Sequence, residues 1–259
     1  MDNWRIRETS QDQVECINNE VHRPVGHWTQ QVHKFLHYLR DQGFYAAPKP
    51  LGFDEQGREI MSFIKGEVYH DLLYQNTASL KVLTSAAKLL RTYHDVSQNF
   101  LNVEPTSKDW MLPCKNPQEL ICHGDFAPYN LVLDGEQAIG MIDFDAAHPG
   151  PRTWDIAYAL YRFAPFTNPN NQDGFGNIED QILRARLFCN TYELAEEKRM
   201  GMADLMIERL QNLIDFMMRS AQEGNKKYEQ NIKDGHHLTY LEDIEYIKMH
   251  KSRIENGIK

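Results

Sequence analysis

Residues 121–145, "ICHGDFAPYNLVLDGEQAIGMIDFD", place carboxylate side chains around two short apolar runs. The runs "NLVLD" and "AIGMIDF" are rich in residues that favour strands, and the Asp134-Gly135 dipeptide between them is typical of a two-residue hairpin turn. The stretch therefore predicts a β-hairpin with a loop at each end. Because both loops leave the same end of the hairpin, their side chains are expected to lie side by side.

These loops carry the chemistry. The first contains His123, Asp125 and Asn130, and the second contains Asp143. Hard oxygen ligands of this kind suit Mg²⁺, which takes one or two carboxylates together with phosphate oxygens and water. If Asn130 and Asp143 hold the metal, Asp125 is free to accept a proton from an attacking hydroxyl. Phosphoryl transfer needs that division of roles. A DxxxxN spacing alone is more typical of a turn, so the combination with His123 and "IDFD" carries the prediction.

"HGDFAPYN" resembles the HxDxxxxN loop of the aminoglycoside phosphotransferase and choline kinase family, which has a protein-kinase-like fold. "IDFD" resembles the metal-binding segment of that family. The resemblance implies that Asp125 is the catalytic aspartate, that Asn130 and Asp143 bind Mg²⁺, and that His123 braces the loop. It also implies ATP, or another nucleoside triphosphate, as the phosphate donor.

Two further aspartates follow the same loops. Asp155 in "WDIAYAL" matches a family aspartate that holds the catalytic loop by hydrogen bonds, which implies a structural role. Asp145 stands where the related protein kinases carry glycine, and both a role beside the substrate and a turn-capping role stay open. The segments "VHRPVGHWT" and "PGPRTWDIAYALYRF" are similar to a bacterial subgroup of the family that includes trifolitoxin immunity proteins.

The N-terminal part is predicted to be a small antiparallel sheet with one helix. Strand patterns surround turn signals within residues 13–23 and again at residues 54–57, which predicts two hairpins. Between them, apolar residues recur at helical spacing from Thr29 and stop at Gly43. The resemblance identifies residues 1–65 as the nucleotide-side lobe of the fold.

The remainder, residues 66–259, is predicted to be a larger and mainly helical lobe for catalysis and substrate binding. The fold class is therefore α+β, as a protein-kinase-like two-lobe fold. Helical periodicity predicts helices over residues 77–98, 155–163, 179–195, 202–222 and 226–256.

The nucleotide side departs from the family pattern. Residues 1–25 contain no glycine, so the Gly-rich loop that covers the phosphates has no counterpart there. Arg23 stands where the strand lysine is expected, and the following helix offers no glutamate, so Gln31 is the candidate partner. Arginine binds phosphate with a different geometry from lysine. Alternatives stay open: the phosphates are held through the metal and Arg23, the donor differs from ATP, the protein binds without turnover, or Arg23 is a plain surface residue.

The hinge of the resembled fold falls on "SFIK" in "PLGFDEQGREIMSFIKGE". The resemblance implies that the backbone of Ser62, Phe63 and Ile64 meets an adenine there. Elsewhere, His94 on the apolar face of its helix is predicted to be a core residue. The aromatic residues of the helix at 155–163 are also predicted to be core, with some at the edge of a substrate site.

Composition bounds the partners. The 259-residue chain has a formal net charge of −9, which argues against a role in binding nucleic acid. Residues 1–65 hold 8 basic and 9 acidic side chains, whereas residues 66–259 hold 20 basic and 28 acidic ones. This excess favours a cationic acceptor, although ordinary solvated surface is the more common reason for such an excess.

Cysteine usage and hydropathy indicate the compartment. The four cysteines are scattered without a CxxC pair, which gives neither a zinc site nor a disulfide framework and favours a reducing interior. No signal peptide and no membrane-spanning run are found, so a cytoplasmic protein that does not bind membranes is expected. The pattern does not indicate an oligomeric state.

The function predicted from these features is that of a transferase, a small-molecule kinase. It moves the γ-phosphoryl group of ATP or another nucleoside triphosphate to a substrate hydroxyl, with Asp125 as the base and Mg²⁺ on Asn130 and Asp143. The alternative is a non-catalytic binding or immunity protein that keeps the fold and lacks the Gly-rich loop and strand lysine.

Overall fold

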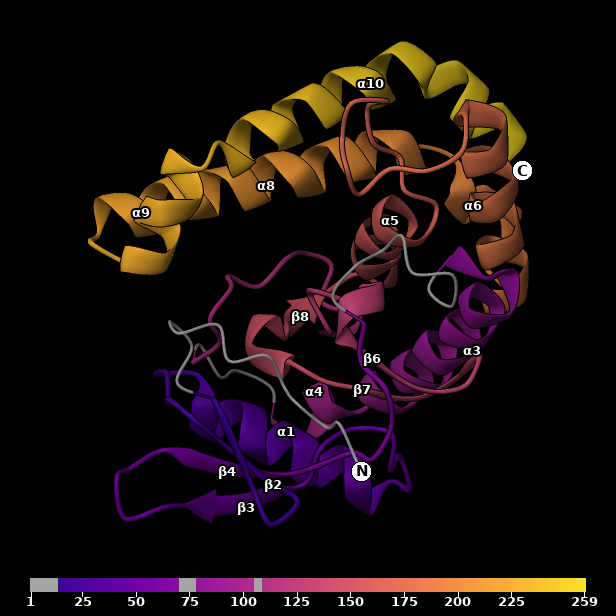
Figure 1. Ribbon diagram of the computed structural model, residues 1–259. Helices are drawn as coiled ribbons and strands as arrows, with labels where there is room; N and C mark the ends of the chain where they lie inside the picture. The colour runs from indigo at the N-terminus through magenta and orange to yellow at the C-terminus, as the bar shows by residue number, and fades with distance from the viewer. Residues whose placement is uncertain (1–13, 70–77, 105–108) are drawn as a thin grey trace.

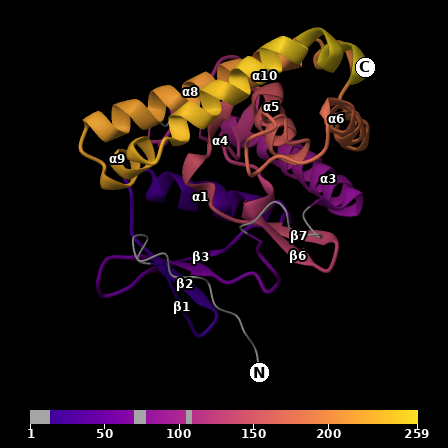
Figure 2. The same ribbon diagram turned by 45° about the horizontal axis from the view of Figure 1, so that its top comes forward.

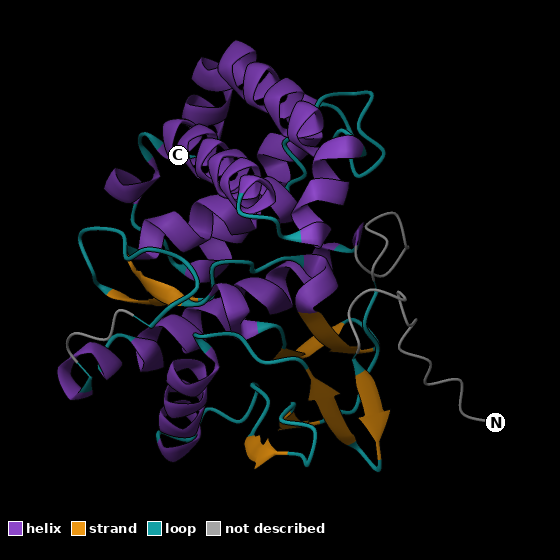
Figure 3. Cartoon of the chain, turned by 90° about the vertical axis from the view of Figure 1, so that its left-hand side faces the viewer, coloured by secondary structure: helices purple, strands orange, loops and turns teal. Residues whose placement is uncertain are grey.

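The computed structural model describes residues 14–69, 78–104 and 109–259. Figures 1 and 3 show a small sheet at one end of the molecule and long helices at the other, which confirms the predicted α+β class. The strands are β1 (Glu15–Ile17), β2 (Glu20–Arg23), β3 (Pro50–Phe53), β4 (Glu59–Ser62), β5 (Leu120–Cys122), β6 (Leu131–Asp134), β7 (Gln137–Met141) and β8 (His148–Gly150). The helices are α1 (Thr29–Asp41), α3 (Leu80–Ser97), α4 (Phe100–Val103), α5 (Arg152–Phe163), α6 (Ile178–Tyr192), α7 (Glu196–Arg199), α8 (Met202–Gln222), α9 (Lys226–Lys233) and α10 (His236–Gly257).

The N-terminal sheet is antiparallel with the strand order β1-β2-β4-β3. Its first hairpin turns at Asn18 and Asn19, whose φ angles of 53° and 64° fit the left-handed turn that an Asn pair accepts. Its second hairpin is closed by the hydrogen bond from Gly57 N to Asp54 O (3.0 Å). Both predicted hairpins are confirmed.

Helix α1 packs the sheet onto the rest of the molecule. Its buried residues include Val32, Phe35 and Leu39, which recur at the predicted helical spacing. The ring of Phe35 contacts the rings of Phe100 and Phe144, which belong to the later part of the chain. One continuous hydrophobic core therefore runs from the sheet into the helices.

The predicted helices of the later part are confirmed within a few residues, with one exception, and residue 77, the predicted start of the first of them, lies outside the described residues. The expected single helix over residues 226–256 is wrong, because the chain breaks at Gly235 into α9 and α10. Gly235 has a φ of 80°, a conformation that ends a helix and favours glycine. Helices α8 and α10 lie side by side with α9 at one end of the pair (Figures 1 and 2).

Two short strand pairs carry the loops of interest. The predicted hairpin is confirmed as β6 and β7, with Leu131 opposite Met141. A second pair, β5 with β8, was not predicted from the sequence, because three-residue strands have no readable periodicity. It sets Leu120 opposite Gly150 and so closes the whole segment between them into one unit. The end of β5 leads into the predicted catalytic loop, and β8 leads into α5.

The described residues contain no helix that is long and apolar enough to cross a membrane.

The predicted lobe boundary at residue 65 stays a prediction. The chain after β4 runs antiparallel to β6, where Glu67 and Leu133 exchange two backbone hydrogen bonds of 2.8 Å each.

Candidate active site

Asp125 lies in the loop between β5 and β6, with its carboxylate held from two sides. The hydroxyl of Tyr129 donates a hydrogen bond to one carboxylate oxygen (2.7 Å). The Asn130 side-chain nitrogen donates to the other oxygen (3.0 Å) and to the Asp125 carbonyl (2.9 Å). Burial raises the pKa of Asp125, while the Tyr129 hydrogen bond opposes that rise. A positioned carboxylate with a raised pKa is suited to accept a proton.

His123 joins this loop to the segment after β7. Its Nε2 donates a hydrogen bond to the carbonyl of Ile142 (3.0 Å), and its Nδ1 accepts one from the backbone N–H of Asp125 (3.3 Å). The two bonds together fix the orientation of the ring between the loop and the segment after β7. Gly124 allows the close approach: its φ is 80°, and an added Cβ would lie 2.1 Å from the carbonyl oxygen of Ala146.

Asp155, at the start of α5, is fully buried beneath the same loop. Its carboxylate accepts hydrogen bonds from the backbone N–H of His123 (2.7 Å) and of Gly124 (2.9 Å). Burial alone would raise the pKa of Asp155, but hydrogen bonds led by the one from His94 lower it to about 2. The side chain is therefore an anion that accepts hydrogen bonds from two backbone N–H groups of the loop.

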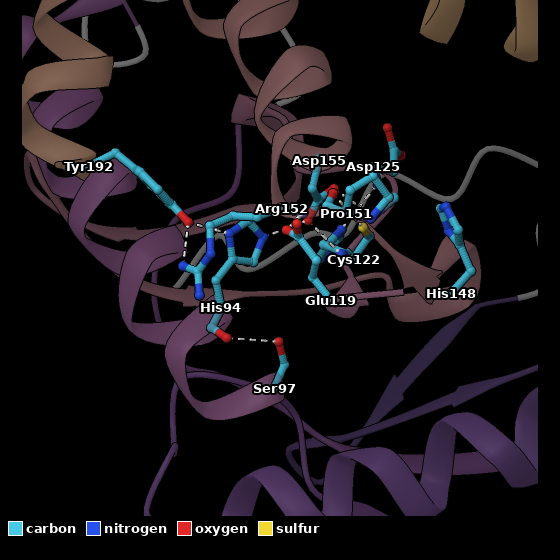
Figure 4. Close-up of polar contacts among 12 residues, drawn as sticks. His94, Ser97, Glu119, Cys122, Asp125, His148, Pro151, Arg152, Asp155 and Tyr192 are labelled. Carbon is cyan, nitrogen blue, oxygen red and sulfur yellow. Dashed lines mark hydrogen bonds and ion pairs between the residues drawn. The ribbon is translucent and has the colours of Figure 1, made fainter. Parts of the chain in front are cut away.

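His94 of α3 continues this chain of hydrogen bonds away from the loop (Figure 4). Its Nε2 lies 3.0 Å from the Asp155 carboxylate, and its Nδ1 lies 2.6 Å from the hydroxyl of Tyr192. Arg152 donates in turn to that hydroxyl (2.7 Å). Burial lowers the pKa of His94, which favours a neutral ring that donates to Asp155 and accepts from Tyr192. The predicted core histidine thus has both ring nitrogens paired.

Asp143 follows β7 and is brought next to Asn130 by the hairpin. The backbone N–H of Ile142 donates to the Asn130 carbonyl (3.0 Å), which ties the two loops together. Asp143 has a φ of 64° and a ψ of 69°, a left-handed conformation that costs a residue other than glycine about 1–3 kcal/mol. Its side chain is 49% exposed. The backbone therefore presents this carboxylate outward, beside Asn130.

Arg23, at the end of β2, reaches across from the N-terminal sheet to the same place. Its guanidinium contacts Glu59 (2.6 Å), Asp143 (3.2 Å) and Asp145 (2.7 Å). Burial opposes its positive charge, but the three carboxylates together raise the pKa of Arg23 further above its usual value. Arg23 is therefore a cation shared by three acidic side chains and is no free surface residue.

Glu59 was not predicted as a site residue. It lies opposite Arg23 in the β2–β4 register and is 2% exposed. Its second oxygen is 2.7 Å from Nε2 of His33 on α1. The buried side-chain nitrogen of Gln31 has no hydrogen-bond partner among the described residues. A neighbouring strand thus supplies Glu59 as an acidic partner of Arg23, whereas the sequence predicts Gln31 of the helix as that partner.

Asp145, left open by the sequence, pairs with Arg23 at 2.7 Å. Burial raises the pKa of Asp145, and the positive charge of Arg23 counteracts that rise. Its contact with a side chain from the first sheet means that it links the two parts of the structure.

Comparisons with known proteins can now be set beside this geometry. Residues 101–188 match the profile of the "Phosphotransferase enzyme family". The trifolitoxin immunity protein of Rhizobium leguminosarum bv. trifolii is 30% identical over 213 residues, which span 80% of this chain and 77% of that relative. The chain belongs to the phosphotransferase enzyme family.

Solved kinase structures share the fold. The ethanolamine kinase of Plasmodium vivax has a TM-score of 0.61 and 14% identity, covering 91% of this chain and 77% of that one. The choline kinase LicA from Streptococcus pneumoniae has a TM-score of 0.57 and 16% identity, covering 93% and 91%. At these identities the likeness shows the fold alone. It confirms the kinase-like two-lobe fold expected for a member of the phosphotransferase enzyme family.

The donor set fits the Mg²⁺ expected in this family site. No group of three or more His, Cys, Asp or Glu is arranged for a metal within residues 14–69, 78–104 and 109–259. Mg²⁺ needs no such cage, because one or two protein ligands completed by phosphate and water suffice. The side-chain nitrogen of Asn130 donates to Asp125, and its side-chain oxygen has no hydrogen bond within the described residues. The half-exposed Asp143, which contacts Arg23, lies beside it.

The predicted hinge residues differ in what they can still offer an adenine. The backbone N–H of Ser62 donates to the Lys49 carbonyl (2.8 Å), and that of Phe63 donates to the Asn19 carbonyl (3.0 Å). Ile64 has neither peptide group hydrogen-bonded to another residue in the described part of the chain. Of the three predicted residues, Ile64 therefore keeps its peptide donor and acceptor available.

Proposed function

We propose that this protein is a small-molecule kinase that transfers the γ-phosphoryl group of ATP, or of another nucleoside triphosphate, to a hydroxyl. Membership of the phosphotransferase enzyme family supports a phosphotransferase in general. The observation that carries the finer proposal is the carboxylate of Asp125, held by Tyr129 and Asn130 beside the outward-facing Asp143.

In the proposed reaction, the acceptor oxygen forms a bond to the γ-phosphorus while the bond to the β–γ bridging oxygen breaks. The hydroxyl proton passes to Asp125, and the nucleoside diphosphate leaves with the bridging oxygen. Burial raises the pKa of Asp125, which makes its carboxylate a stronger proton acceptor than an exposed aspartate. Tyr129 and Asn130 orient the carboxylate, and His123 keeps the loop at its distance from the Asp143 segment.

Asn130 and Asp143 are the proposed ligands of Mg²⁺. When bound, the ion neutralises charge on the phosphate oxygens as transfer proceeds. The left-handed backbone at Asp143 sets the direction of its carboxylate before any ligand arrives. Asp155 is the proposed structural support, because it accepts hydrogen bonds from two backbone N–H groups of the loop.

On the donor side, Arg23 is the proposed phosphate-binding cation in place of a strand lysine. Its planar guanidinium binds phosphate through two parallel hydrogen bonds, which requires it to exchange at least one of its present carboxylate partners. Glu59 keeps the guanidinium oriented through Nε during that exchange. Ser62, Phe63 and Ile64 form the proposed adenine side, with Ile64 offering its peptide groups.

The proposed acceptor is a small hydroxyl compound. On net charge alone, the acidic excess of residues 66–259 favours a cationic acceptor, whereas the side chains considered in the next subsection favour an acceptor with a carboxylate. A panel of cationic, neutral and anionic hydroxyl compounds distinguishes the two predictions.

The proposal is tested by phosphate transfer with purified protein, Mg²⁺ and ATP. We expect transfer or slow ATP hydrolysis that Asp125→Asn abolishes. Asp134→Asn is the matched control, because Asp134 is an exposed aspartate at the far end of the same hairpin. Equal activity in the Asp125 variant and the wild type would falsify the assignment of the base.

A second candidate is a non-catalytic binding or immunity protein with the same fold. It is favoured by the relative that is named as an immunity protein and by the absence of glycine in residues 1–25. A thermal-shift titration separates the two, since a ligand that binds only the folded state raises its apparent stability. If millimolar ATP with Mg²⁺ leaves the melting temperature unchanged, the second candidate is preferred.

A further inference from the structure

One face of α5 runs along the catalytic loop. Asp155, Tyr158 and Arg162 follow each other at spacings of three and four residues, which places them on the same side of a helix. Asp155 binds the backbone of the loop. The Tyr158 hydroxyl meets that of Tyr129 at 3.1 Å, and the guanidinium of Arg162 lies 5.1 Å from the centre of the Tyr129 ring. The face therefore leads from the loop backbone to its side chains, ending at Arg162.

Arg162 is buried and poorly paired. It is 7% exposed, and its hydrogen bond to a described residue runs from Nη2 to the half-exposed Asp173 at 3.3 Å, near the limit for such a bond. Its Nε is buried without any partner in the described ranges. A buried charged donor that stays unpaired costs free energy. The guanidinium thus has unused capacity for an anion.

One tyrosine side chain, that of Tyr129, separates this guanidinium from the proposed base. Tyr129, on whose ring Arg162 lies, donates its hydroxyl to Asp125 (2.7 Å). A second buried arginine, Arg209 of α8, lies 4.5 Å from the centre of the Tyr158 ring and also has an unpaired Nε among the described residues. In spite of the net charge of −9, two buried guanidinium groups, one on α5 and one on α8, therefore lie against the tyrosines next to Asp125.

We propose that Arg162 binds a carboxylate group of the hydroxyl compound that Asp125 deprotonates. The inference rests on the proposed kinase function, and it assigns the acceptor to hydroxyl compounds that carry a carboxylate. Arginine pairs with a carboxylate through two parallel hydrogen bonds, and Nε with Nη2 forms one such edge of the guanidinium. Asp173 occupies half of that edge and is the group that the acceptor displaces.

The experiment measures binding without nucleotide, by thermal shift of the full chain. The probes are matched pairs that differ only in the acid: N-acetylserine with N-acetylserinamide, and 3-hydroxybutyrate with 3-hydroxybutyramide, with choline as a cationic probe. The variants are Arg162→Gln, Arg162→Lys and Asp173→Asn. Arg253→Gln is the matched control, because Arg253 is an exposed arginine of α10 that pairs only with Glu179 among the described residues.

We expect at least one acid to stabilise the wild type and the Arg253 control, and its amide to have at most about a tenth of the affinity. Arg162→Gln loses the acid preference, and Arg162→Lys, which keeps the charge and loses the fork, retains a weakened one. Asp173→Asn strengthens acid binding, because it removes the competing carboxylate. A purely structural Arg162–Asp173 pair would instead lower the melting temperature in the Asp173 variant and leave the acid preference unchanged.

The inference is overturned if no acid stabilises the wild type, if amides or choline stabilise it equally, or if Arg162→Gln keeps the preference. Failure of the kinase function is distinguishable, because phosphate transfer is assayed separately. Acid-selective binding that depends on Arg162, without any transfer, removes the kinase function and keeps the anion site. Transfer that depends on Asp125, without any preference for acids, keeps the kinase function and removes the anion site.

Discussion

The proposed catalytic loop and the proposed nucleotide side of this molecule are held in opposite ways. Around the loop, the hydrogen bonds all run in one direction. Arg152 donates to the Tyr192 hydroxyl, which donates to His94, and His94 donates to Asp155. Asp155 also accepts hydrogen bonds from the backbone N–H groups of the loop. On the nucleotide side, one cation is divided among three carboxylates. A donor-to-acceptor chain leaves little choice of arrangement, whereas a shared cation keeps several partners available. The first suits a fixed proton acceptor, and the second suits a group that must exchange partners when a ligand binds.

The largest effect is expected at the loop. Asp125→Asn removes the proposed proton acceptor, and we expect phosphate transfer to fall by about 10²–10⁴-fold. The free energy of unfolding should not fall, because burial already disfavours the charged form of Asp125. Transfer rates and urea unfolding measure the two effects. A large loss of stability would mean that the carboxylate serves the fold, and the contrast between the two sides would then need revision.

The next effect tests how strictly the loop is held. Asp155→Asn replaces the buried carboxylate, which accepts hydrogen bonds from two backbone N–H groups, with a neutral amide. We expect the free energy of unfolding to fall by about 3–5 kcal/mol. Asp95→Asn is the control: Asp95 is a half-exposed partner of Arg152, and exposed ion pairs contribute about 1 kcal/mol or less. Similar losses in both variants, measured in urea, would contradict a specific role for Asp155.

Acid should weaken the same contact. The pKa of Asp155 is about 2 in the folded protein and 3.8 without the folded environment. As the pH falls, the folded state therefore binds this proton at a lower pH than the unfolded state does. Its contribution is fully present above about pH 4 and is lost as the pH falls from 4 to 2, which amounts to roughly 2 kcal/mol. Urea unfolding at several pH values measures it. If the difference in stability between the wild type and Asp155→Asn does not shrink over this range, the assigned pKa is wrong.

The smallest effect sharpens the nucleotide side. Arg23→Lys keeps the charge but loses the planar fork, and we expect KM for the nucleotide to rise about tenfold with a smaller change in kcat. Arg58→Lys is the control, because Arg58 neighbours Glu59 on β4 and pairs with Asp54 and Glu15 instead. An unchanged KM in Arg23→Lys would show that any cation suffices there, and the shared-cation arrangement would lose its significance.

Sequence reasoning reached the parts of this structure that are coded locally. "HGDFAPYN" and "IDFD" are each contained within eight residues, so the groups near Asp125 and Asp143 could be named together, although their catalytic roles stay predictions. The confirmed helices have repeating apolar stripes, and the two N-terminal hairpins have recognisable turns. Local spacing also carried one signal that was overlooked: Asp234-Gly235 is a typical helix end, and it divides α9 from α10.

What was missed depends on pairing between distant segments. Glu59 meets Arg23 because β2 and β4 align in one register, and no periodicity in either strand specifies which residues face each other. The β5–β8 pair joins two three-residue segments across a long loop. Arg162 could have been found, since its spacing from Asp155 and Tyr158 places it on one helix face, but its unpaired Nε is visible only in three dimensions.

The geometry at Gly124 bears on how mutational scans of this protein should be interpreted. Even alanine would bring a Cβ within 2.1 Å of the Ala146 carbonyl oxygen, so the two loops would have to separate by about 1 Å, and the φ of 80° adds strain. Every substitution there is expected to score as badly as loss of Asp125. Gly124 nevertheless contributes no side chain to the reaction. Tolerance data alone would therefore rank a spacer equal to the proposed base, and a separate measurement of stability is needed to tell them apart.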